Sequence, residues 1–430
     1  MAGMQGRVLA AVAALTLLAG NAVPTTPQSD YAAIRAAWAE ARAAARSDAG
    51  AALPRYDALI ETATGNRGVL LSAISVAMKA QDRVRLARWL ALFVEQGGGF
   101  APEDRAEIGQ MLGAGSEAVL ARAGENMREI GTVELLAEIP GELELVEGIA
   151  RDPRGGAIYA SSVRDRRIEQ VDSAGMRRNV LQLTEADGFP MALAYDSRRR
   201  LLWAAVDSAL FPTDKAGAGG VMRMSPETGE HVLIGAEPGA ALHIGDITVA
   251  PDGTVYAADS QSGAVYRCAI GCTQLRVLVP AGRLRSGQGM ALAPDGKRLY
   301  VADFAYGLLA VELASGATVR VDKAPGIALD GIDGIAMRGT KLIAIQNGWA
   351  PARVIEIGFD AKGSTATSVR VLARGKPAGE EPGQFTLGRG GAVLMVANSQ
   401  WGRLAEPEAG RSPAKPTQLV RLIEPKGGRR

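Results

Sequence analysis

"SGQGMALAPDGKRLYVADF", residues 286–304, consists of two short apolar runs on either side of a tight turn. The turn "PDG" combines proline, aspartate and glycine, which favour the backbone angles of a reversal. Two apolar runs joined in this way are typical of a β-hairpin. The stretch therefore predicts two neighbouring antiparallel strands, and similar stretches occur elsewhere in the chain.

Five further segments share this pattern of apolar run, Asp/Gly-rich or Arg-rich turn and second apolar run. They are "EGIARDPRGGAIYASS" (147–162), "MALAYDSRRRLLWAAVDS" (191–208), "GDITVAPDGTVYAADS" (245–260), "DGIAMRGTKLIAIQNG" (333–348) and "GQFTLGRGGAVLMVANSQ" (383–400). A third apolar strand follows each of the six, and a fourth follows five of them. Four strands per unit, repeated every 43 to 54 residues, is the pattern of a β-propeller. The sequence predicts a mainly β fold with six blades.

The last unit lacks an outer strand, because the chain ends soon after "QLVRLIE" (418–424). A spare strand, "GTVELLAEI" (131–139), stands just before the first unit. We expect it to complete the last blade, which closes the ring and removes an open sheet edge. The propeller is thus predicted to span residues 131–425.

The amino terminus has the features of a secretory signal peptide. Arg7 precedes the apolar run "VLAAVAALTLLAG" (8–20), and small residues follow up to Ala22. The apolar run is short for a bilayer span. We expect residues 1–22 to be removed and the protein to be periplasmic or secreted, the alternative being an uncleaved anchor. No later stretch is apolar enough to predict a transmembrane segment.

Residues 23–130 differ in composition from the rest of the chain. Ala, Leu, Arg and Glu dominate, and apolar residues recur every three to four positions, as in "YAAIRAAWAEARAAARSD" (31–48). We expect four or five helices packed as hairpins, with a weak resemblance to tetratricopeptide repeats. Such a domain is either a cap without a ligand of its own or a surface that docks a protein partner.

Only two cysteines occur, Cys268 and Cys272. They predict a disulfide or two free thiols, since a zinc site would need further Cys or His ligands nearby. Lys and Arg number 48 and Asp and Glu 46, so the chain lacks the basic excess typical of nucleic-acid binding.

In a propeller the first strand of each blade lies nearest the axis, and all six begin at one mouth of the central channel. We call the residues at these positions the blade-start residues: Glu147, Met191, Gly245, Gln288, Asp333 and Pro382. Two carboxylates brought together with an amide need a proton or a cation to balance their charge. Oxygen donors of this kind suit a hard divalent cation such as Ca²⁺, Mg²⁺ or Mn²⁺.

The repeat region resembles the gluconolactonase/regucalcin (senescence marker protein) family of six-bladed propellers, with paraoxonase as a more distant relative. The residues that carry the resemblance are "SGQGMALAPDGKRLYVADF" (286–304) and "DGIDGIAM" (330–337). The resemblance implies one axial divalent cation, Ca²⁺ first and Mg²⁺, Mn²⁺ or Zn²⁺ as alternatives, on Glu147, Gln288 and Asp333. The chain departs from the family at Gln288 and Gly245, where the family has asparagine. The helical domain is not part of the family pattern.

The activity implied by the resemblance is metal-dependent hydrolysis of a small lactone or ester. Asp333 is then the expected general base. Asp246 and His243 are candidates for contact with substrate hydroxyls or for proton transfer, and Asn347 is a candidate for substrate contact. Serine hydrolase and nucleotide-binding motifs are missing from the sequence. The alternative is a non-catalytic periplasmic propeller that serves as a binding or scaffold protein and docks a partner through its helices, because propellers host both roles.

Overall fold

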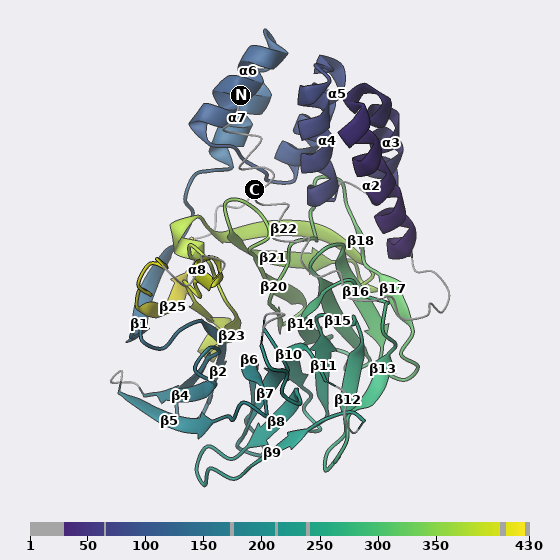
Figure 1. Cartoon of the computed structure of the whole chain (residues 1–430). Helices are drawn as coiled ribbons and strands as arrows, with labels where there is room; N and C mark the ends of the chain where they lie inside the picture. Colours follow the sequence, from purple (N-terminus) through teal and green to yellow (C-terminus); the bar gives the residue numbers. More distant parts are fainter. Residues whose placement is uncertain are drawn as a thin grey trace.

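The computed structural model describes residues 30–63, 66–172, 176–210, 214–237, 241–404 and 410–425. The predicted signal peptide, residues 1–22, lies outside the described residues. Within them, no helix combines the length and the hydropathy that a membrane span requires. The two parts expected from the sequence are both present: a mainly β six-bladed propeller, and a group of helices that precedes it (Figure 1).

The helical domain contains six helices in its described residues, one or two more than expected. They are α2 (Asp30–Ser47), α3 (Ala49–Thr62), α4 (Arg67–Lys79), α5 (Arg83–Glu95), α6 (Pro102–Leu112) and α7 (Glu117–Glu125). The expected count was too low because polar caps divide long helical stretches. The Asp82 carboxylate accepts a hydrogen bond from the Arg85 N–H at 2.9 Å and so starts α5 directly after α4. Gly113 has a positive φ of 74° and ends α6 before α7.

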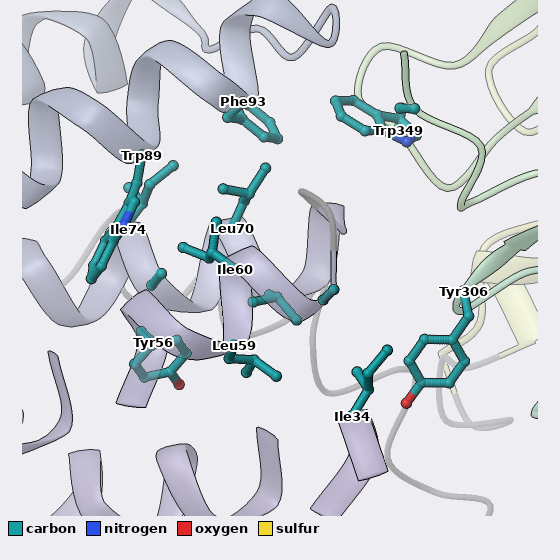
Figure 2. Packing of buried hydrophobic residues seen from close by; sticks show 14 of the residues in the cluster. Ile34, Tyr56, Leu59, Ile60, Leu70, Ile74, Trp89, Phe93, Tyr306 and Trp349 are labelled. Carbon is teal, nitrogen blue, oxygen red and sulfur yellow. The ribbon is translucent and has the colours of Figure 1, made fainter. Parts of the chain in front are cut away.

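The helices pack on the propeller and share one apolar core with it (Figure 2). Fully buried Tyr56 and Trp89 lie in the helical part of this core, and Tyr306 and Trp349 enter it from the propeller. Polar contacts cross the same boundary: Asn66 Nδ2 donates to the Ala305 carbonyl at 2.5 Å. The helical domain is therefore an integral layer of the molecule.

The described residues of the propeller form six sheets, five of which have four antiparallel strands. In four of these five sheets the strands follow one another in sequence order. In the fifth, the amino-terminal strand β1 is the outer strand. Blade 1 is β2 (Val146–Arg151), β3 (Ile158–Ser162), β4 (Arg167–Val171) and β5 (Arg177–Gln182); blade 2 is β6 (Phe189–Asp196), β7 (Leu201–Asp207), β8 (Gly220–Met224) and β9 (His231–Ile234). Blade 3 is β10 (Ile244–Val249), β11 (Val255–Asp259), β12 (Val265–Cys268) and β13 (Arg276–Val279); blade 4 is β14 (Gly287–Leu292), β15 (Arg298–Asp303), β16 (Gly307–Glu312) and β17 (Thr318–Arg320).

Blades 5 and 6 depart slightly from the simple unit. Blade 5 is β19 (Ile335–Arg338), β20 (Lys341–Gln346), β21 (Arg353–Phe359) and β22 (Thr365–Arg374), to which β18 (Asp322–Lys323) adds a short parallel strand. Blade 6 is β23 (Phe385–Leu387), β24 (Val393–Val396), β25 (Thr417–Ile423) and β1 (Thr132–Ile139).

The ring is closed by the pairing of β1 with β25. The two strands are antiparallel, with Thr132 opposite Ile423 and Ile139 opposite Thr417. The strand expected from residues 131–139 thus supplies the outer edge of the last blade. Backbone pairing in this sheet joins the first and last strands of the propeller, so closure does not depend on side-chain packing alone.

Close packing of the first strands explains a glycine that recurs after the blade-start residues. A Cβ on Gly148 would lie 2.2 Å from the Met191 carbonyl oxygen, and one on Gly289 would lie 2.5 Å from the Asp333 carbonyl oxygen. Neighbouring first strands therefore approach at backbone distance around the axis. Only glycine leaves room for this approach.

Cys268, the last residue of β12, forms a disulfide with Cys272, and their Cα atoms are 5.5 Å apart. This settles the choice left open by the sequence between a disulfide and two free thiols. The bridge encloses a short turn on blade 3, away from the channel mouth.

Candidate functional site

A cavity of about 620 Å³ opens at the channel mouth, and we call it the axial cavity. All six blade-start residues line it, as the propeller geometry requires. Other lining residues come from the ends of second strands and from the loops of blade 6; among them are Asp207, His243, Asn347, Gln384 and Trp401. Residues from all six blades therefore line the same cavity at the channel mouth.

Glu147 and Asp333 form the acidic centre of this cavity. Glu147 is 5% exposed, and its Oε2 accepts a hydrogen bond from Trp401 Nε1 at 2.8 Å. Asp333 accepts from Asn347 Nδ2 at 2.7 Å through Oδ2 and from Gln384 Nε2 at 3.4 Å through Oδ1. Neutral donors hold both carboxylates in place, but they do not balance the charge.

The two carboxyl groups destabilise each other's ionised forms. Burial, together with the nearby Asp333, raises the pKa of Glu147 from 4.5 to about 8. Burial also raises the pKa of Asp333, and the hydrogen bond from Asn347 opposes this rise. Without a cation, the pair therefore retains a proton at neutral pH.

The cavity wall offers no positive side chain to offset this pair. Its described lining contains five carboxylates, one histidine and neither lysine nor arginine. The carboxylates are Glu147, Asp207, Asp333, Glu380 and Glu381. Such a surface disfavours anionic ligands and favours cations and uncharged polar molecules.

Asn347 contributes an oxygen that has no partner among the described residues. Its Nδ2 donates to Asp333 Oδ2 and, at 3.2 Å, to the Pro382 carbonyl. Both partners are acceptors, so the orientation of the amide is fixed. Its Oδ1 is buried and accepts no hydrogen bond from any described residue. A buried oxygen without a donor is a place where a cation or a ligand donor is favoured.

Gln288, the third residue expected to bind the metal, also lines the axial cavity. Its Nε2 donates to Ser286 Oγ at 3.0 Å, which leaves its Oε1 as the atom available to a ligand. That oxygen lies on the side of Gly245. A Cβ at Gly245 would lie 3.6 Å from this oxygen, which is an ordinary van der Waals distance.

Among the residues that the structure describes, no three His, Cys, Asp or Glu side chains form a cluster suited to a metal ion. The axial cavity instead combines two such groups, Glu147 and Asp333, with amide oxygens. Their raised pKa values and the unpartnered Asn347 Oδ1 fit a hard divalent cation, which binds carboxylate and amide oxygens and water.

Second-strand ends occupy equivalent positions in the blades, yet their side chains have different roles. Asp259 Oδ1 accepts from the N–H groups of Gln261 and Ser262 at 3.0 and 2.7 Å. Asp303 accepts from the Ala305 N–H at 3.0 Å and from the Arg285 N–H at 2.6 Å. These two aspartates shape the following loops and are absent from the cavity lining, so their observed role is structural.

Asp207 ends β7 at the corresponding position, but it contacts a side chain of the axial cavity. Its Oδ1 accepts from the Ala209 N–H at 3.0 Å and also contacts Nδ1 of His243 at 2.8 Å. Both side chains line the axial cavity. His243 was expected in the site, whereas Asp207 was not singled out. The repeat could have identified it, because it is one of three aspartates at second-strand ends.

Asp246 does not line the axial cavity, although the sequence made it a candidate for substrate contact. It is 6% exposed, and its Oδ2 accepts from the Met290 N–H at 2.7 Å. Burial raises the pKa of Asp246 to about 7. Its observed contact joins the first strands of blades 3 and 4.

Trp401 and Gln384 are site residues that sequence reasoning missed. Trp401 belongs to α8 (Trp401–Leu404), a short helix between β24 and β25. The repeat pattern gives no position to a residue in such an inserted loop. Gln384 follows the blade-start residue Pro382 by two positions, and only the path of the loop brings its amide to Asp333.

No protein-family model and no curated protein matches this chain. Among solved structures, it is similar to a gluconolactonase from Xanthomonas campestris, with 18% identity, 68% of this chain and 89% of that chain covered, and a TM-score of 0.48. It is also similar to regucalcin from Agrobacterium tumefaciens, a calcium-binding protein, with 18% identity, coverage of 69% and 98%, and a TM-score of 0.47.

A third similar structure is an aldose sugar dehydrogenase from Streptomyces coelicolor, with 17% identity, coverage of 68% and 98%, and a TM-score of 0.47. The structural neighbours thus include gluconolactonase- and regucalcin-like six-bladed propellers alongside a protein with a different activity. At this level of identity the likeness concerns the fold alone.

Proposed function

We propose that this protein is a hydrolase of small, uncharged lactones or esters, which bind in the axial cavity beside one divalent cation. The observation that supports it best is the pair of the buried Glu147 and the partly buried Asp333 in a cavity without a lysine or arginine in its described lining. The reaction class comes from the resemblance of the blade starts to the gluconolactonase/regucalcin family. Ca²⁺ is the first choice because all available donors are oxygens.

Glu147, Asp333 and the amide oxygens of Asn347 and Gln288 would hold the cation. When bound, it would polarise the substrate carbonyl and stabilise the oxyanion of the tetrahedral intermediate. Trp401 fixes the orientation of Glu147, and Asn347 and Gln384 fix that of Asp333. Because these donors are uncharged, they orient the carboxylates and leave their negative charge to be balanced by the cation.

Asp333 fits the role of a ligand better than that of the general base expected from the sequence. Both of its oxygens already accept hydrogen bonds from amides. A carboxylate that also binds a cation loses basicity, because the cation favours the ionised form. Proton transfer therefore calls for another group in the axial cavity.

The scaffold alternative receives less support from the structure. The helices share their core with the propeller. Among the described residues of α2–α7, Val84 is the exposed large hydrophobic side chain, at 81%. An apolar docking face for a protein partner is therefore not found on the described helices. Export remains a separate prediction from residues 1–22, which sequencing of the mature amino terminus checks.

The test combines metal binding with hydrolysis. Chelated wild-type protein is titrated with Ca²⁺, Mg²⁺, Mn²⁺ and Zn²⁺ by calorimetry, and then assayed on uncharged and anionic lactones and esters. We expect one divalent site, loss of that site in Glu147→Gln and Asp333→Asn, and a preference for uncharged substrates. Glu230→Gln, at an exposed turn, is the matched control and should behave like wild type. Wild-type protein that binds no divalent ion and hydrolyses no member of the panel would contradict the proposal.

A further inference from the structure

His243 and Asp207 form a dyad on the wall of the axial cavity. The imidazole Nδ1 lies 2.8 Å from Asp207 Oδ1, and the two side chains are 19% and 11% exposed. A carboxylate can only accept, so Nδ1 carries the hydrogen of this bond. The other ring nitrogen, Nε2, is thereby left as the one that can exchange a proton with a ligand.

Hydrogen bonds from blade 3 also fix the backbone of His243. The His243 N–H donates to Asp259 Oδ2 at 3.1 Å, and the Ser260 N–H donates to the His243 carbonyl at 2.9 Å. Asp259 thus supports the loop that carries the histidine, while Asp207 orients its ring. Two neighbouring blades, through the ends of β7 and β11, determine where the imidazole lies.

Asp207 departs from the structural role of its counterparts. Asp259 and Asp303 each use their second oxygen to bind a backbone N–H of the loop that enters their own blade. Asp207 instead contacts an imidazole that belongs to the next blade. Asp207 keeps one backbone bond, from the Ala209 N–H. Its second partner is a side chain that lines the axial cavity, which points to a role there.

Ser208 follows Asp207 directly, but it does not complete a nucleophilic triad. Its Oγ is 3.4 Å from both Nδ1 and Nε2 of His243, so it is aligned with neither nitrogen. The residue is fully buried and is not part of the cavity lining. A substrate carbonyl could not reach this hydroxyl, and the dyad acts without it.

We infer that His243, oriented by Asp207, is the proton-transfer residue of the axial cavity. This inference rests on the proposed hydrolase function and deepens it. Neutral His243 Nε2 takes a proton from water as the water oxygen bonds to the substrate carbonyl carbon. When the tetrahedral intermediate collapses, the bond between that carbon and the leaving oxygen breaks, and the imidazolium returns the proton to this oxygen. The net change is one water added and one hydroxy acid, or acid and alcohol, released.

The charges facing the imidazole are all negative among the described residues that contact it. Asp207 at the end of β7 and Asp259 at the end of β11 both favour the imidazolium. The bond to Asp207 raises the pKa of His243 above 6.5, and burial opposes this rise. Because the neutral form is the base, activity should increase as the pH rises through this pKa.

Direct titration tests the geometry, because the chain contains only two histidines, His231 and His243. His231 is exposed on β9. In the NMR spectrum of the whole protein, His231→Gln assigns the two imidazole signals. We expect His243 to titrate above the ordinary value of 6.5, and Asp207→Asn to lower the pKa of His243. A His243 that titrates at the ordinary value of 6.5 and is unaffected by Asp207→Asn would overturn the dyad.

Activity tests the role. We expect His243→Gln to lower kcat by about 100-fold or more without removing the divalent site, and added imidazole to restore part of the activity of His243→Ala. Asp207→Asn should shift the acidic limb of the pH–rate profile to lower pH, which a purely structural role would not do. If His243→Gln keeps kcat within about threefold and keeps the wild-type pH profile, the assignment of His243 is overturned and the hydrolase stands. If wild type hydrolyses no lactone or ester, the hydrolase proposal falls and the assignment with it.

Discussion

Phe93 on α5 stacks on the indole of Trp349 in the loop after β20, with ring centroids 5.4 Å apart and ring planes 12° apart (Figure 2). The guanidinium of Arg353 also lies over this indole, 4.8 Å from its centroid, and donates to the Gln96 carbonyl at 3.0 Å. The same loop begins with Asn347, which holds Asp333. The helical domain thus supports a loop that carries part of the candidate site.

Replacement of Trp349 by alanine should affect both stability and the site. Trp349 is 3% exposed, and loss of a buried tryptophan costs about 3–5 kcal/mol of unfolding free energy. We expect a lower midpoint of urea unfolding and weaker divalent-cation binding in calorimetry. The cation effect follows because the loop that positions Asn347 loses its packing against α5.

Val84→Ala serves as the control for this experiment. Val84 lies on the same helix as Phe93 but is 81% exposed, so its truncation should change stability by less than about 0.5 kcal/mol. If Trp349→Ala is as stable as Val84→Ala, the stack does not join the two parts of the molecule in solution.

The architecture could be predicted from the sequence because every blade repeats the same local rules. A turn such as "PDG" at 294–296 encodes a hairpin without help from distant residues, and the number of repeated segments gives the number of blades. Closure by residues 131–139 followed from counting strands, since one unit lacked its outer strand. The number of helices was harder to predict because caps such as Asp82 break a continuous apolar periodicity.

The site could be predicted only as far as the repeat register extends. Glu147 and Asp333 were found because they hold equivalent positions in two blades, and Gln288 and His243 because they lie at or next to such positions. Trp401 lies in the short helix α8, inserted between two strands, and Gln384 lies in an irregular loop. The path of both segments depends on tertiary packing. Asp246 could not be distinguished from a cavity residue, because a first-strand side chain faces either the channel or a neighbouring blade.

Strand β1 should contribute to stability through its buried end. Ile139 is 1% exposed and packs in the core between blades 6 and 1, whereas Val133 on the same strand is 41% exposed. We expect Ile139→Ala to lower the free energy of unfolding by about 2–5 kcal/mol in urea denaturation. Val133→Ala should change it by less than about 0.5 kcal/mol. Equal effects of the two substitutions would contradict the closed ring.

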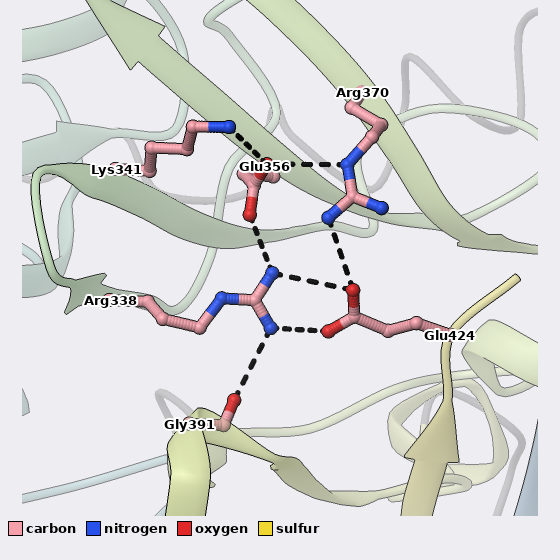
Figure 3. A network of polar contacts seen from close by, with 6 residues as sticks. All are labelled: Arg338, Lys341, Glu356, Arg370, Gly391 and Glu424. Atoms are coloured by element: carbon pink, nitrogen blue, oxygen red, sulfur yellow. Dashed lines mark hydrogen bonds and ion pairs between the residues drawn. The ribbon is translucent and has the colours of Figure 1, made fainter. Parts of the chain in front are cut away.

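A charge network joins blades 5 and 6 (Figure 3). Glu356 is 6% exposed and accepts from Arg338 at 2.6 Å, Lys341 at 2.9 Å and Arg370 at 3.2 Å. Glu424, after the last strand of blade 6, binds Arg338 and Arg370. Burial alone would raise the pKa of Glu356, but Arg370, Arg338 and Lys341 outweigh it and lower this pKa from 4.5 to about 2.

Glu356→Gln should therefore lower the free energy of unfolding by about 3 kcal/mol at neutral pH. A lowered pKa stabilises the folded state above the unfolded-state value near 4.5, and this contribution is lost as the pH falls towards 2. The difference between wild type and variant, measured by urea unfolding, should shrink between pH 4.5 and 3. Glu312→Gln, whose side chain is half exposed beside Arg298, should show neither effect.

Glu147 should give the opposite dependence on pH in protein freed of metal by a chelator. Its pKa is raised to about 8 by burial and by Asp333, so the folded state keeps a proton that the unfolded chain loses above about pH 4.5. Stability should therefore fall as the pH rises from 4.5 to 8. Glu147→Gln removes this loss, and at pH 8.5 we expect the variant to exceed chelated wild type by on the order of 2 kcal/mol.

Added Ca²⁺ should reverse the order of the two proteins. A cation between Glu147 and Asp333 favours the ionised carboxylates, so wild type gains stability from Ca²⁺ and gains more at pH 8.5 than at pH 5. Glu147→Gln should gain little at either pH. The measurement is the urea midpoint of both proteins in chelator and in Ca²⁺, with Glu230→Gln as the control. A wild type whose stability in chelator rises with pH as steeply as that of Glu147→Gln would show that the axial carboxylates do not interact as described.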